Sequence, residues 1–578
     1  MSAAMRADAS TFDADVLVVG AGPVGQTLCI DLAKRGVSVV LIERNETCLQ
    51  HPKMERCNAR TMEFYRRLGL ADRIRAASRF RDIPMDVFIA THLCGKKLLQ
   101  LSYVSVAAMQ EAGRRCNDGT MPLEPYQLIS QYTLEPLLKS VVESLPKADV
   151  RFGCELISFA QDAAGVNADV KYADGRTAKI RTRYMVGCDG GNSTVRKQLG
   201  IELEGRGRIS QQRQIFFRSE TLFSQLPFGP GRHYHFPSGM IVVQDDLRHF
   251  MANTGSVSGP APAVLLQEIF RINVPFEVLN VALWHQNLLV AERYSDRRVF
   301  LAGDAVHLVI PTGGLGMNTG VGDAIDLSWK LAGTLAGWGG PNVLSSYELE
   351  RRPVGLHNRD VSGRAAAGVN SWRAACRPDI DSDTPEGEAN REEVARLAAI
   401  GQRLSHEMIG TDLGYSYAGS PLICTDDEPP PALTDDRYQP TTRPGSRLPH
   451  VWLDDGQALH DQIGSEFTLI RLCGNHTALP TLRQSFAEFG AQLDIVQVDS
   501  NPAREVYGYD LVLVRPDLHV VLARQLSSCR PSHCRHDRNG ARMKSPTSSV
   551  GWTHSNFRFR RHARSAVAET QASNVTTA

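Results

Sequence analysis

Residues 299–332, VFLAGDAVHLVIPTGGLGMNTGVGDAIDLSWKLA, pass from a short apolar run through a glycine-rich loop into a helical pattern. The apolar run stops at Gly303 and Asp304, and the loop glycines let backbone approach a ligand where side chains would block it. A helix is expected to open near Met317 and Asn318, where free N–H groups and the positive end of the helix dipole attract an anion. The stretch therefore predicts a strand, an anion-binding turn and a helix, although an isolated run of this kind can also be a loop without chemistry.

A second turn of this kind follows a short apolar strand near the N-terminus, where residues 15–25 read DVLVVGAGPVG. In this G-x-G-x-x-G pattern, Gly20 permits the tight turn and Gly22 lets a pyrophosphate reach the helix N-terminus. Gly25 allows the helix to pack closely on the strand. The pattern is a dinucleotide-binding fingerprint because a strand is expected before it and a helix after it.

The residues after these glycines complete a βαβ unit. Pro23 opens a helix that is expected to reach about residue 35, and residues 37–42 supply a second apolar strand. Glu43 ends this strand about 20 residues after the glycines, where its carboxylate can accept a hydrogen bond from a ribose hydroxyl. Glu43 and the adjacent Arg44 are therefore candidate cofactor contacts, although the fingerprint alone does not separate NAD from FAD.

A third strand runs into a glycine turn in residues 184–196, YMVGCDGGNSTVR, which contain Asp189 and Arg196. Together the three segments resemble the single-component FAD-dependent aromatic hydroxylases, the family that contains p-hydroxybenzoate hydroxylase and phenol hydroxylase. The resemblance covers residues 13–353. It implies an α/β fold, with a Rossmann-like FAD-binding domain, an interleaved β-sheet substrate domain and a C-terminal thioredoxin-like α/β domain.

The resemblance also implies roles within these segments. Asp304 would hold the ribityl or pyrophosphate region of FAD, and residues 311–318 would face the isoalloxazine ring. Asp189 and Arg196 would belong to a segment that serves both FAD and the reduced nicotinamide. The candidate cofactor contacts of the glycine-rich loop are Gly303, Asp304, Pro311, Gly316, Met317 and Asn318.

Smaller landmarks agree with the same family. Gln131, in the segment ISQYTLEPL, matches a glutamine that touches the ribityl chain, and Arg60 lies in a matching NARTME helix. The segment YELERRP at residues 347–353 matches as well. Outside this context Gln131 would be an ordinary polar residue at a helix start and Arg60 a solvated helix charge.

The chemistry implied by the resemblance uses NADH or NADPH to reduce FAD, and O2 to form a flavin C4a-hydroperoxide that hydroxylates a phenolic ring. Backbone N–H groups near residues 316–318 would stabilise negative charge on the flavin, which makes Asn318 and Pro311 catalytic candidates. Glu55, five residues before Arg60, is the candidate base that helps to deprotonate the phenol. A solvated glutamate on the approach to a helix is the alternative interpretation of Glu55.

The run GRHYHF at residues 231–236 places His233 and His235 on one face of an expected strand, with Tyr234 between them. These three are the substrate-site candidates, because a strand of this kind can line an aromatic pocket or simply pack within a sheet. No metal is expected, since the run offers no third ligand. The sequence also shows no constellation of Arg or Lys that would mark a carboxylate on the substrate, and larger polycyclic phenols stay open.

The same landmarks divide the chain into expected domains. These are a split FAD-binding domain at 13–210 and 298–375, a substrate-binding sheet domain at 211–297 with part of 80–125, a helical region and linker at 376–445, a thioredoxin-like domain at 446–524 and a tail at 525–578.

The expected thioredoxin-like domain shows a strand at 466–472, a helix at 482–489 and strands at 493–498 and 511–514. It lacks redox cysteines, so it is interpreted as structural or as the surface of a homodimer. The tail is rich in Arg, Ser, His and Cys without periodicity and is expected to be disordered. An out-of-frame extension is the preferred explanation of the tail, and a basic segment that binds an anionic surface is the alternative.

Composition favours a cytoplasmic enzyme without a nucleic-acid or membrane partner. The 578 residues are 42% hydrophobic and carry a formal net charge of +1, which argues against generic binding of polyanions. The first ten residues lack the apolar core of a signal peptide, and no apolar span reaches the ~18 residues of a membrane helix. The twelve cysteines form no C-x-x-C pair and are expected to be reduced.

Three other functions remain compatible with a flavin-binding fingerprint. A flavin halogenase would carry a W-x-W-x-I-P segment, which none of the six tryptophans forms. A flavin reductase or dehydrogenase of the same fold would share the cofactor site without inserting oxygen. A flavin-binding protein without catalysis is the third alternative.

Overall fold

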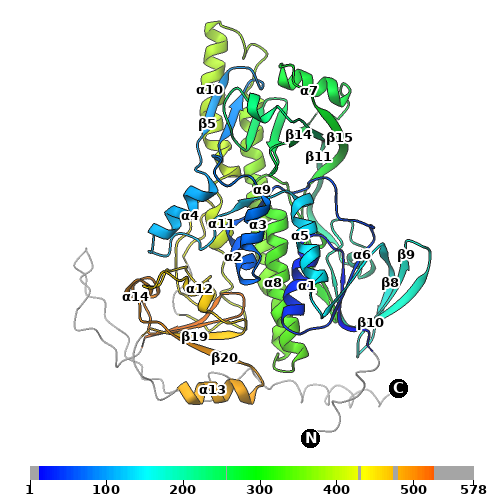
Figure 1. The fold of residues 1–578 in the computed structure, drawn as a ribbon, viewed down its shortest axis with the longest axis vertical. Helices are drawn as coiled ribbons and strands as arrows, with labels where there is room; N and C mark the ends of the chain where they lie inside the picture. The colour runs from blue at the N-terminus through cyan, green and yellow to red at the C-terminus, as the bar shows by residue number, and fades with distance from the viewer. Residues whose placement is uncertain (1–11, 256, 427–430, 473–478, 526–578) are drawn as a thin grey trace, which may run out of the picture.

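The computed structural model describes residues 12–255, 257–426, 431–472 and 479–525, and the predicted tail lies outside them apart from its first residue. The described residues form an α/β fold with two eight-stranded sheets, a four-stranded sheet and a two-stranded ribbon. Figure 1 shows the first large sheet with its helices at mid-height and the second at the top. The expected fold class is confirmed.

The first sheet carries the glycine turns. Its main path is β16-β17-β10-β1-β2-β7, and β8 and β9 extend it as an antiparallel hairpin beside β10. The strands are β1 (Ala14–Val19), β2 (Val39–Glu43), β7 (Ala148–Phe152), β8 (Cys154–Gln161), β9 (Val166–Tyr172), β10 (Thr177–Gly187), β16 (Ser295–Asp296) and β17 (Val299–Leu301). The central strands are continuously apolar because helices cover them, as in other parallel sheets.

Three parallel strands end side by side in this sheet. Val19 of β1 is in register with Gly187 of β10, and Gly187 is in register with Leu301 of β17. Each of these residues directly precedes one of the three turns recognised in the sequence. The edge at the carboxyl ends of parallel strands is the place where α/β sheets bind ligands.

Two helices start from this edge and pack against each other, namely α1 (Pro23–Lys34) and α8 (Leu315–Leu335). The start of α8 lies two residues before the expected Met317, because Gly314 adopts a left-handed φ of 66° and serves as the N-cap. The second strand of the βαβ unit begins at Val39 rather than at residue 37. These shifts are small, since helix and strand ends fray.

The second sheet has the order β18-β15-β11-β14-β13-β12-β4-β5. Its strands are β4 (Val87–Ala90), β5 (Lys97–Leu101), β11 (Leu203–Arg218), β12 (His233–Phe236), β13 (Gly239–Val243), β14 (His249–Thr254), β15 (Glu277–Ala291) and β18 (His307–Leu308). The strands of this sheet pair antiparallel, except that β12 and β4 are parallel. The two strands β4 and β5, which come early in the chain, complete the sheet beside β12. The predicted boundary at residue 211 falls inside β11.

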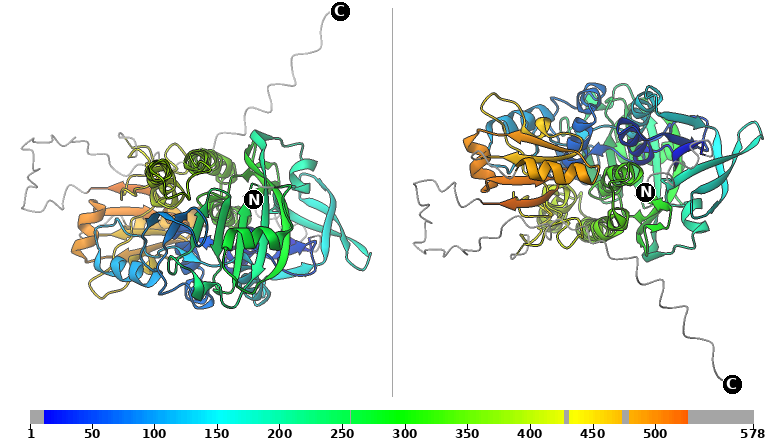
Figure 2. Two further views of the ribbon diagram at one scale, coloured as in Figure 1. Left: turned by 90° about the horizontal axis from the view of Figure 1, so that it is seen from above. Right: turned by 90° about the horizontal axis from the view of Figure 1, so that it is seen from below.

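The C-terminal sheet has the order β20-β19-β21-β22, with β19 and β20 parallel. Its elements are β19 (Phe467–Arg471), α13 (Leu479–Glu488), β20 (Leu493–Gln497), α14 (Asn501–Tyr507), β21 (Leu511–Val514) and β22 (Val520–Arg524). The sequence reading missed α14 and β22, because elements of seven and five residues give almost no periodic signal. Figure 2 shows this sheet at the end of the molecule opposite the β8–β9 hairpin.

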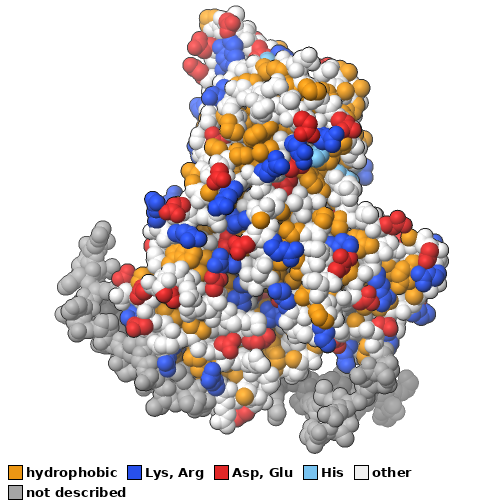
Figure 3. Space-filling view, viewed as in Figure 1, with side chains coloured by type: hydrophobic (Ala, Val, Ile, Leu, Met, Phe, Trp, Pro, Cys, Tyr) orange, Lys and Arg blue, Asp and Glu red, His pale blue; other side chains and the backbone are white. Residues whose placement is uncertain are grey.

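The remaining elements connect and cover the sheets. They are β3 (Arg56–Cys57), α2 (Ala59–Arg67), α3 (Ala71–Ala77), α4 (Val106–Arg115), β6 (Gln127–Leu128), α5 (Gln131–Glu143), α6 (Thr194–Gln198), η2 (Phe223–Gln225), α7 (Pro262–Phe270), η3 (Gly303–Ala305), α9 (Pro341–Ala374), α10 (Pro385–Gly401), η4 (Arg403–Ser405), α11 (Ile409–Leu413) and α12 (Leu459–Gln462). Within the described residues, the helices are all too short or too polar to cross a membrane. On the face drawn in Figure 3, Lys and Arg side chains are interspersed with Asp and Glu side chains.

Candidate active site

The turn after β1 leaves an open cradle at the start of α1. Gly20 has a φ of 103°, and a Cβ there would lie 2.5 Å from the carbonyl oxygen of Cys188. A Cβ on Gly25 would collide with the carbonyl oxygen of Gly20, so both positions require glycine. A Cβ on Gly22 would meet nothing within 4 Å, and Gly22 gives α1 no side-chain cap. The N-terminus of α1 therefore faces free space that suits a phosphate.

Glu43 fastens the same turn from the end of β2. One carboxylate oxygen accepts from the backbone N–H of Ala21 at 2.9 Å, and the other accepts from the backbone N–H of Asn45 at 2.9 Å. Arg44 is exposed to solvent. Glu43 thus lies beside the cradle, as the βαβ unit predicts, while the exposed Arg44 has no hydrogen bond or ion pair to another described residue.

The second and third turns are tied together by side chains. Asp189 accepts from Ser193 Oγ at 2.6 Å and from the backbone N–H of Thr194 at 2.7 Å, which shapes the turn after β10. Arg196 donates to the carbonyl oxygen of Ala305 at 2.9 Å, in the turn after β17. The structure therefore brings Asp189, Arg196 and the segment at Gly303 to one place.

Asp304 lies in the turn after β17, close to the start of α8. Its side chain is accessible to solvent, yet burial among protein atoms raises the pKa of its carboxyl. One carboxylate oxygen lies 4.0 Å from the position that a Cβ on Gly316 would take. Asp304 is therefore accessible to a ligand at the edge where the three strands end.

The segment YELERRP, residues 347–353, supports the end of β17 and the turn after it. Tyr347 donates from its hydroxyl to the carbonyl oxygen of Leu301 at 2.8 Å. Arg351 pairs with Asp323 at 2.8 Å, and Asp323 accepts from the backbone N–H of Gly303 at 3.1 Å. The matching segment therefore fixes the end of β17 rather than contacting a ligand.

The loop at residues 311–318 is held by Asn318. Its side-chain oxygen accepts from the backbone N–H of Asn58 at 2.8 Å, and its nitrogen donates to the carbonyl oxygen of Gly314 at 2.6 Å. Gly314 provides no side-chain cap for α8, and Pro311 is exposed. The Asn318 side chain thus fixes the backbone of the loop, and the uncapped start of α8, including the half-buried Gly316 and Met317, is left to face a ligand.

Two predicted cofactor contacts are engaged by other parts of the protein. Gln131 donates to Glu135 at 2.6 Å and accepts from the backbone N–H of Lys53 at 3.2 Å. Arg60 pairs with Glu63 and donates to the carbonyl oxygen of Asp517 at 2.7 Å, so its guanidinium faces the C-terminal sheet. Arg60 also lines a small pocket with Leu315 and Asn318 at the start of α8.

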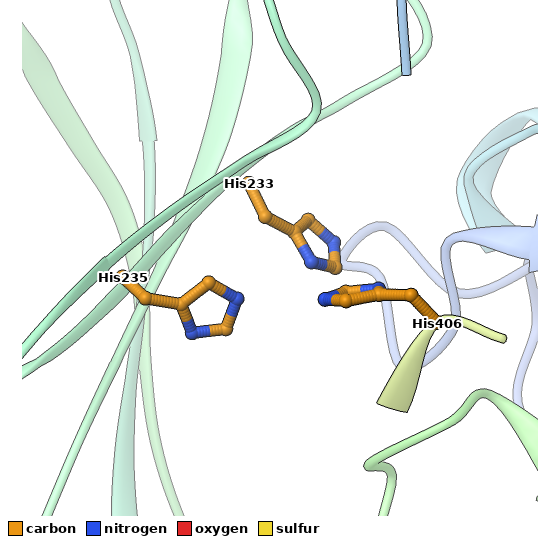
Figure 4. Close-up of side chains that lie close together, drawn as sticks. All are labelled: His233, His235 and His406. Atoms are coloured by element: carbon orange, nitrogen blue, oxygen red, sulfur yellow. The ribbon is translucent and has the colours of Figure 1, made fainter. Parts of the chain in front are cut away.

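On the opposite side of the loop, β12 presents its histidines. His233 and His235 point toward His406, which follows η4, and one ring nitrogen from each of the three lies within 4.8 Å of the others (Figure 4). His406 is therefore the third imidazole that the sequence reading could not supply. Tyr234 points to the other face of the sheet, where its ring stacks on Phe88 at a centroid distance of 5.2 Å and is fully buried.

Glu55 is bound to the first of these histidines. Its carboxylate lies 2.7 Å from Nε2 of His233, while Nδ1 of His233 is buried and has no hydrogen-bond partner among the described residues. His233 and the nearby arginines lower the pKa of Glu55 to about 2 in spite of its burial. A carboxylate with so low a pKa holds a proton poorly at neutral pH, which makes Glu55 itself a weak base.

Two arginines complete this region, and the sequence reading did not select either of them. Arg56 and Arg232 each lie against the Tyr126 ring, with the guanidinium carbons 5.9 Å and 5.6 Å from its centroid. Arg56 donates to the carbonyl oxygen of Gly313 and so connects the region to the loop at 311–318. The sequence shows no such arginine pair, because Arg56 and Arg232 are far apart along the chain and only the fold joins them.

The chain was compared with protein families and with individual proteins. Residues 13–362 match the FAD binding domain family, and residues 441–536 match the aromatic-ring hydroxylase C-terminal family. The FAD-dependent monooxygenase apdD of Emericella nidulans is 32% identical, over 87% of this chain and 86% of the relative. The 4-methyl-5-nitrocatechol 5-monooxygenase of a Burkholderia species is 30% identical, over 87% of this chain and 92% of the relative.

Solved structures show the same fold. RebC with bound 7-carboxy-K252c superposes with a TM-score of 0.81 at 32% identity, over 89% of this chain and 96% of RebC. The flavin-dependent monooxygenase PieE in complex with FAD and substrate superposes with a TM-score of 0.80 at 28% identity, over 89% of this chain and 96% of PieE.

Proposed function

The chain belongs to the FAD-dependent aromatic-ring hydroxylases, and we propose that it hydroxylates a phenolic ring with NADH or NADPH and O2 as co-substrates. The observation that carries this proposal is the alignment of three glycine turns at the ends of neighbouring strands of one sheet. The relative named as a 4-methyl-5-nitrocatechol 5-monooxygenase supports an aromatic substrate.

We assign the cofactor to the edge formed by β1, β10 and β17. The open cradle at Gly22 would hold the pyrophosphate on the N-terminus of α1, and the exposed Asp304 would contact the sugar-phosphate chain. The proposed contacts are Gly20, Gly22, Pro23, Gly25, Glu43, Asp189, Arg196, Gly303, Asp304, Pro311, Gly316, Met317 and Asn318. Bound FAD would supply the redox and oxygen chemistry, while the protein supplies position and electrostatics.

The start of α8 would stabilise negative charge on the flavin ring. Its N-cap, Gly314, has no side chain, so no cap occupies the backbone N–H groups of residues 315–317, which would face the flavin ring. Asn318 would act by holding this backbone, since both polar atoms of its side chain are bound to the protein. Asn318 is therefore proposed as a positioning residue.

The base that receives the phenolic proton is proposed to be His233, oriented by Glu55. With Nε2 of His233 donating to the Glu55 carboxylate, Nδ1 carries the free lone pair inside the pocket. Burial lowers the pKa of His233, which keeps the imidazole neutral and able to accept a proton. Phenolate is the better electron donor, so deprotonation favours hydroxylation of the ring.

The experiment that tests this function measures NADH and NADPH oxidation by the FAD-loaded protein with a series of phenols of one to three rings. We expect some phenols to stimulate oxidation and to appear as hydroxylated products in proportion to the nicotinamide consumed. Oxidation that no phenol stimulates would indicate a reductase or dehydrogenase instead. FAD binding without any nicotinamide oxidation would indicate a flavin-binding protein without catalysis.

A further inference from the structure

A chain of hydrogen bonds connects a carboxyl group on α11 to the flavin loop, residues 311–318. Asp412 accepts from Nδ2 of Asn58 at 2.7 Å, and the backbone N–H of Asn58 donates to Oδ1 of Asn318 at 2.8 Å. Nδ2 of Asn318 donates in turn to the carbonyl oxygen of Gly314, the N-cap of α8, at 2.6 Å. Three hydrogen bonds therefore separate the side chain of Asp412 from the start of α8.

The two asparagines in this chain are fixed in place. Asn58 is the N-cap of α2, which packs against α11, and its Oδ1 accepts from the backbone N–H of Thr61 at 2.9 Å (Figure 1). Only 7% of Asn58 and 7% of Asn318 is exposed. Since the side-chain oxygen and nitrogen of both residues are bound to the protein, α11, α2 and the flavin loop are held as one unit. Asp412 thus has a defined place behind the loop.

Asp412 is an acid without an ion pair to any described residue. Burial raises the pKa of its carboxyl to about 6, although the charge of Arg56 and the hydrogen bond from Asn58 act in the opposite direction. Arg56 itself donates to the carbonyl oxygen of Gly313 in the flavin loop. The charged groups on the other segments around α11 are paired among themselves: Arg60 with Glu63, Arg351 with Asp323, and Asp435 with Arg364. Asp412 is therefore the group here that changes its charge close to neutral pH.

Asp412 also lines a small cavity behind the start of α8. The cavity has a volume of about 20 Å³, enough for one water molecule, and its polar lining includes Asn58, Asn318, Asn358 and Tyr415. Asn358 is only 6% exposed, and its Oδ1 has no partner among the described residues. A water molecule in this cavity would have polar partners on several sides and would bring protons to Asp412.

We propose that Asp412 takes up a proton when the flavin is reduced, and that it thereby makes reduction more favourable as the pH falls. The inference rests on the proposed function, because it requires FAD at the start of α8. In the reductive step NADH or NADPH gives a hydride to FAD and becomes oxidised, so negative charge appears beside the flavin loop. An ionised Asp412 opposes that charge, whereas the neutral acid, formed with one proton from solvent, does not. Asp412 is a positioning residue in this role, since it does not touch the cofactor.

The test measures the flavin midpoint potential of the FAD-loaded protein and of Asp412→Asn, by equilibration with redox dyes from about pH 5 to about pH 8. The new amide keeps an oxygen that can accept from Asn58, so the fold is retained while the titration is lost. At about pH 5 the wild-type Asp412 is already largely neutral, and the two potentials should agree. At about pH 8 loss of the carboxylate should favour reduction about tenfold, which is a potential about 30 mV more positive for a two-electron couple.

A second variant and a control complete the test. Asn58→Ser keeps a good N-cap for α2 but lacks the amide that donates to Asp412. Loss of this hydrogen bond should raise the pKa of Asp412, so the additional pH dependence of the potential should move to higher pH. Asp436→Asn removes an exposed carboxylate and is the control, which should have the wild-type potential at every pH.

Equal potentials of the wild type and Asp412→Asn at about pH 8 would overturn the inference, and so would a difference that is just as large at about pH 5. A shift of the same size in Asp436→Asn would also overturn it, because the effect would then be one of overall charge. The proposed function is judged separately, by oxidation of NADH or NADPH that phenols stimulate in the wild type. If FAD binds but no phenol stimulates oxidation, the hydroxylase proposal fails and the potentials still decide the role of Asp412. A protein that binds no FAD would contradict both.

Discussion

This protein contains two buried clusters of charged side chains. In one cluster every charged group forms an ion pair, and in the other the arginines form none among the described residues. The interface cluster joins α8 and α9 to the C-terminal sheet and consists of Asp326, Lys330, Glu350, Arg515 and Asp517. In it, Lys330 lies 2.6 Å from both Asp326 and Glu350, and Arg515 lies within 2.8 Å of all three acids. Every charge faces an opposite charge.

The pocket cluster consists of Arg56, Arg232, His233, His235 and His406, and it is almost as deeply buried. Its two guanidinium groups have no carboxylate partner in the described chain, and several of its nitrogens have no hydrogen-bond partner. A saturated cluster can only contribute to structure, whereas an unsaturated one has binding capacity left for a ligand. The difference separates a structural network from a binding site at the same level of burial.

The largest effect is expected when the interface cluster is broken. Arg515→Met leaves Asp326, Glu350 and Asp517 with Lys330 as the main remaining cation, and should lower the free energy of unfolding by about 3–5 kcal/mol. Urea unfolding followed by circular dichroism measures this change. The control is Arg504→Met, since Arg504 pairs with an exposed Asp499 and should leave stability unchanged within error.

In the pocket cluster, loss of the proposed base should affect rate rather than stability. His233→Gln should lower kcat for phenol hydroxylation about 100-fold, the lower end for general-base catalysis, with FAD content unchanged. Stopped-flow and steady-state measurements of product formation test this. A rate that is unaffected would exclude His233 as the base.

Glu55→Gln separates the orienting role of Glu55 from the base itself. The Glu55 carboxylate raises the pKa of His233 by favouring the imidazolium, so removing its charge should lower that pKa further. The acidic limb of the pH–rate profile should therefore move to lower pH, while the maximal rate falls by less than in His233→Gln. An acidic limb that stays in place would show that His233 does not control the rate.

Two glycines of the first turn differ in the space around them, since a Cβ on Gly22 would meet no atom and a Cβ on Gly25 would collide with the backbone. Gly22→Ala adds a methyl group to free space and should weaken FAD binding about tenfold, the equivalent of one lost hydrogen bond, without changing stability. Gly25→Ala places its methyl group against the Gly20 carbonyl and should destabilise the protein instead. Isothermal titration with FAD and thermal unfolding of the FAD-free variants distinguish the two.

The smallest effect is expected on stability when Arg232 is replaced. Arg232→Met removes a buried charge that lacks an acid, so the free energy of unfolding should not fall and can rise by about 1 kcal/mol. The measurement is made beside Arg515→Met under the same conditions. A loss as large as that of Arg515→Met would mean that the pocket cluster is paired after all.

Much of the fold was predictable because short contiguous segments of the sequence determine its strands, turns and helices. Residues 15–25 specify a strand, a turn and the start of a helix within one short segment. Their glycines permit the positive φ of Gly20 and the close backbone approach at Gly25. The two other turns could be recognised in the same way, and their arrangement at one sheet edge follows from parallel pairing. Short elements such as α14 and β22 escaped because they contain too few residues to show a period.

The candidate site was only partly predictable. The sequence predicted that His233 and His235 share one face of a strand. It also selected Glu55 as a candidate base, but it did not predict that Glu55 binds His233. Tyr234 was chosen with them, but strand alternation turns its side chain into the core. Arg60 matched a family segment, yet its guanidinium donates to the carbonyl oxygen of Asp517 in the C-terminal domain. The residues around Arg60 in the sequence do not predict this long-range contact.

By itself the sequence determined the three strand-turn-helix segments and the FAD-binding family to which they belong, since backbone geometry depends on neighbouring residues. Only the tertiary structure decided which charges are satisfied. Arg56 lies on β3, Arg232 directly before β12 and His406 after η4, and a buried group's partners are set by whichever distant segments fold against it. The balance between donors and acceptors in the pocket cluster is therefore a property of the fold.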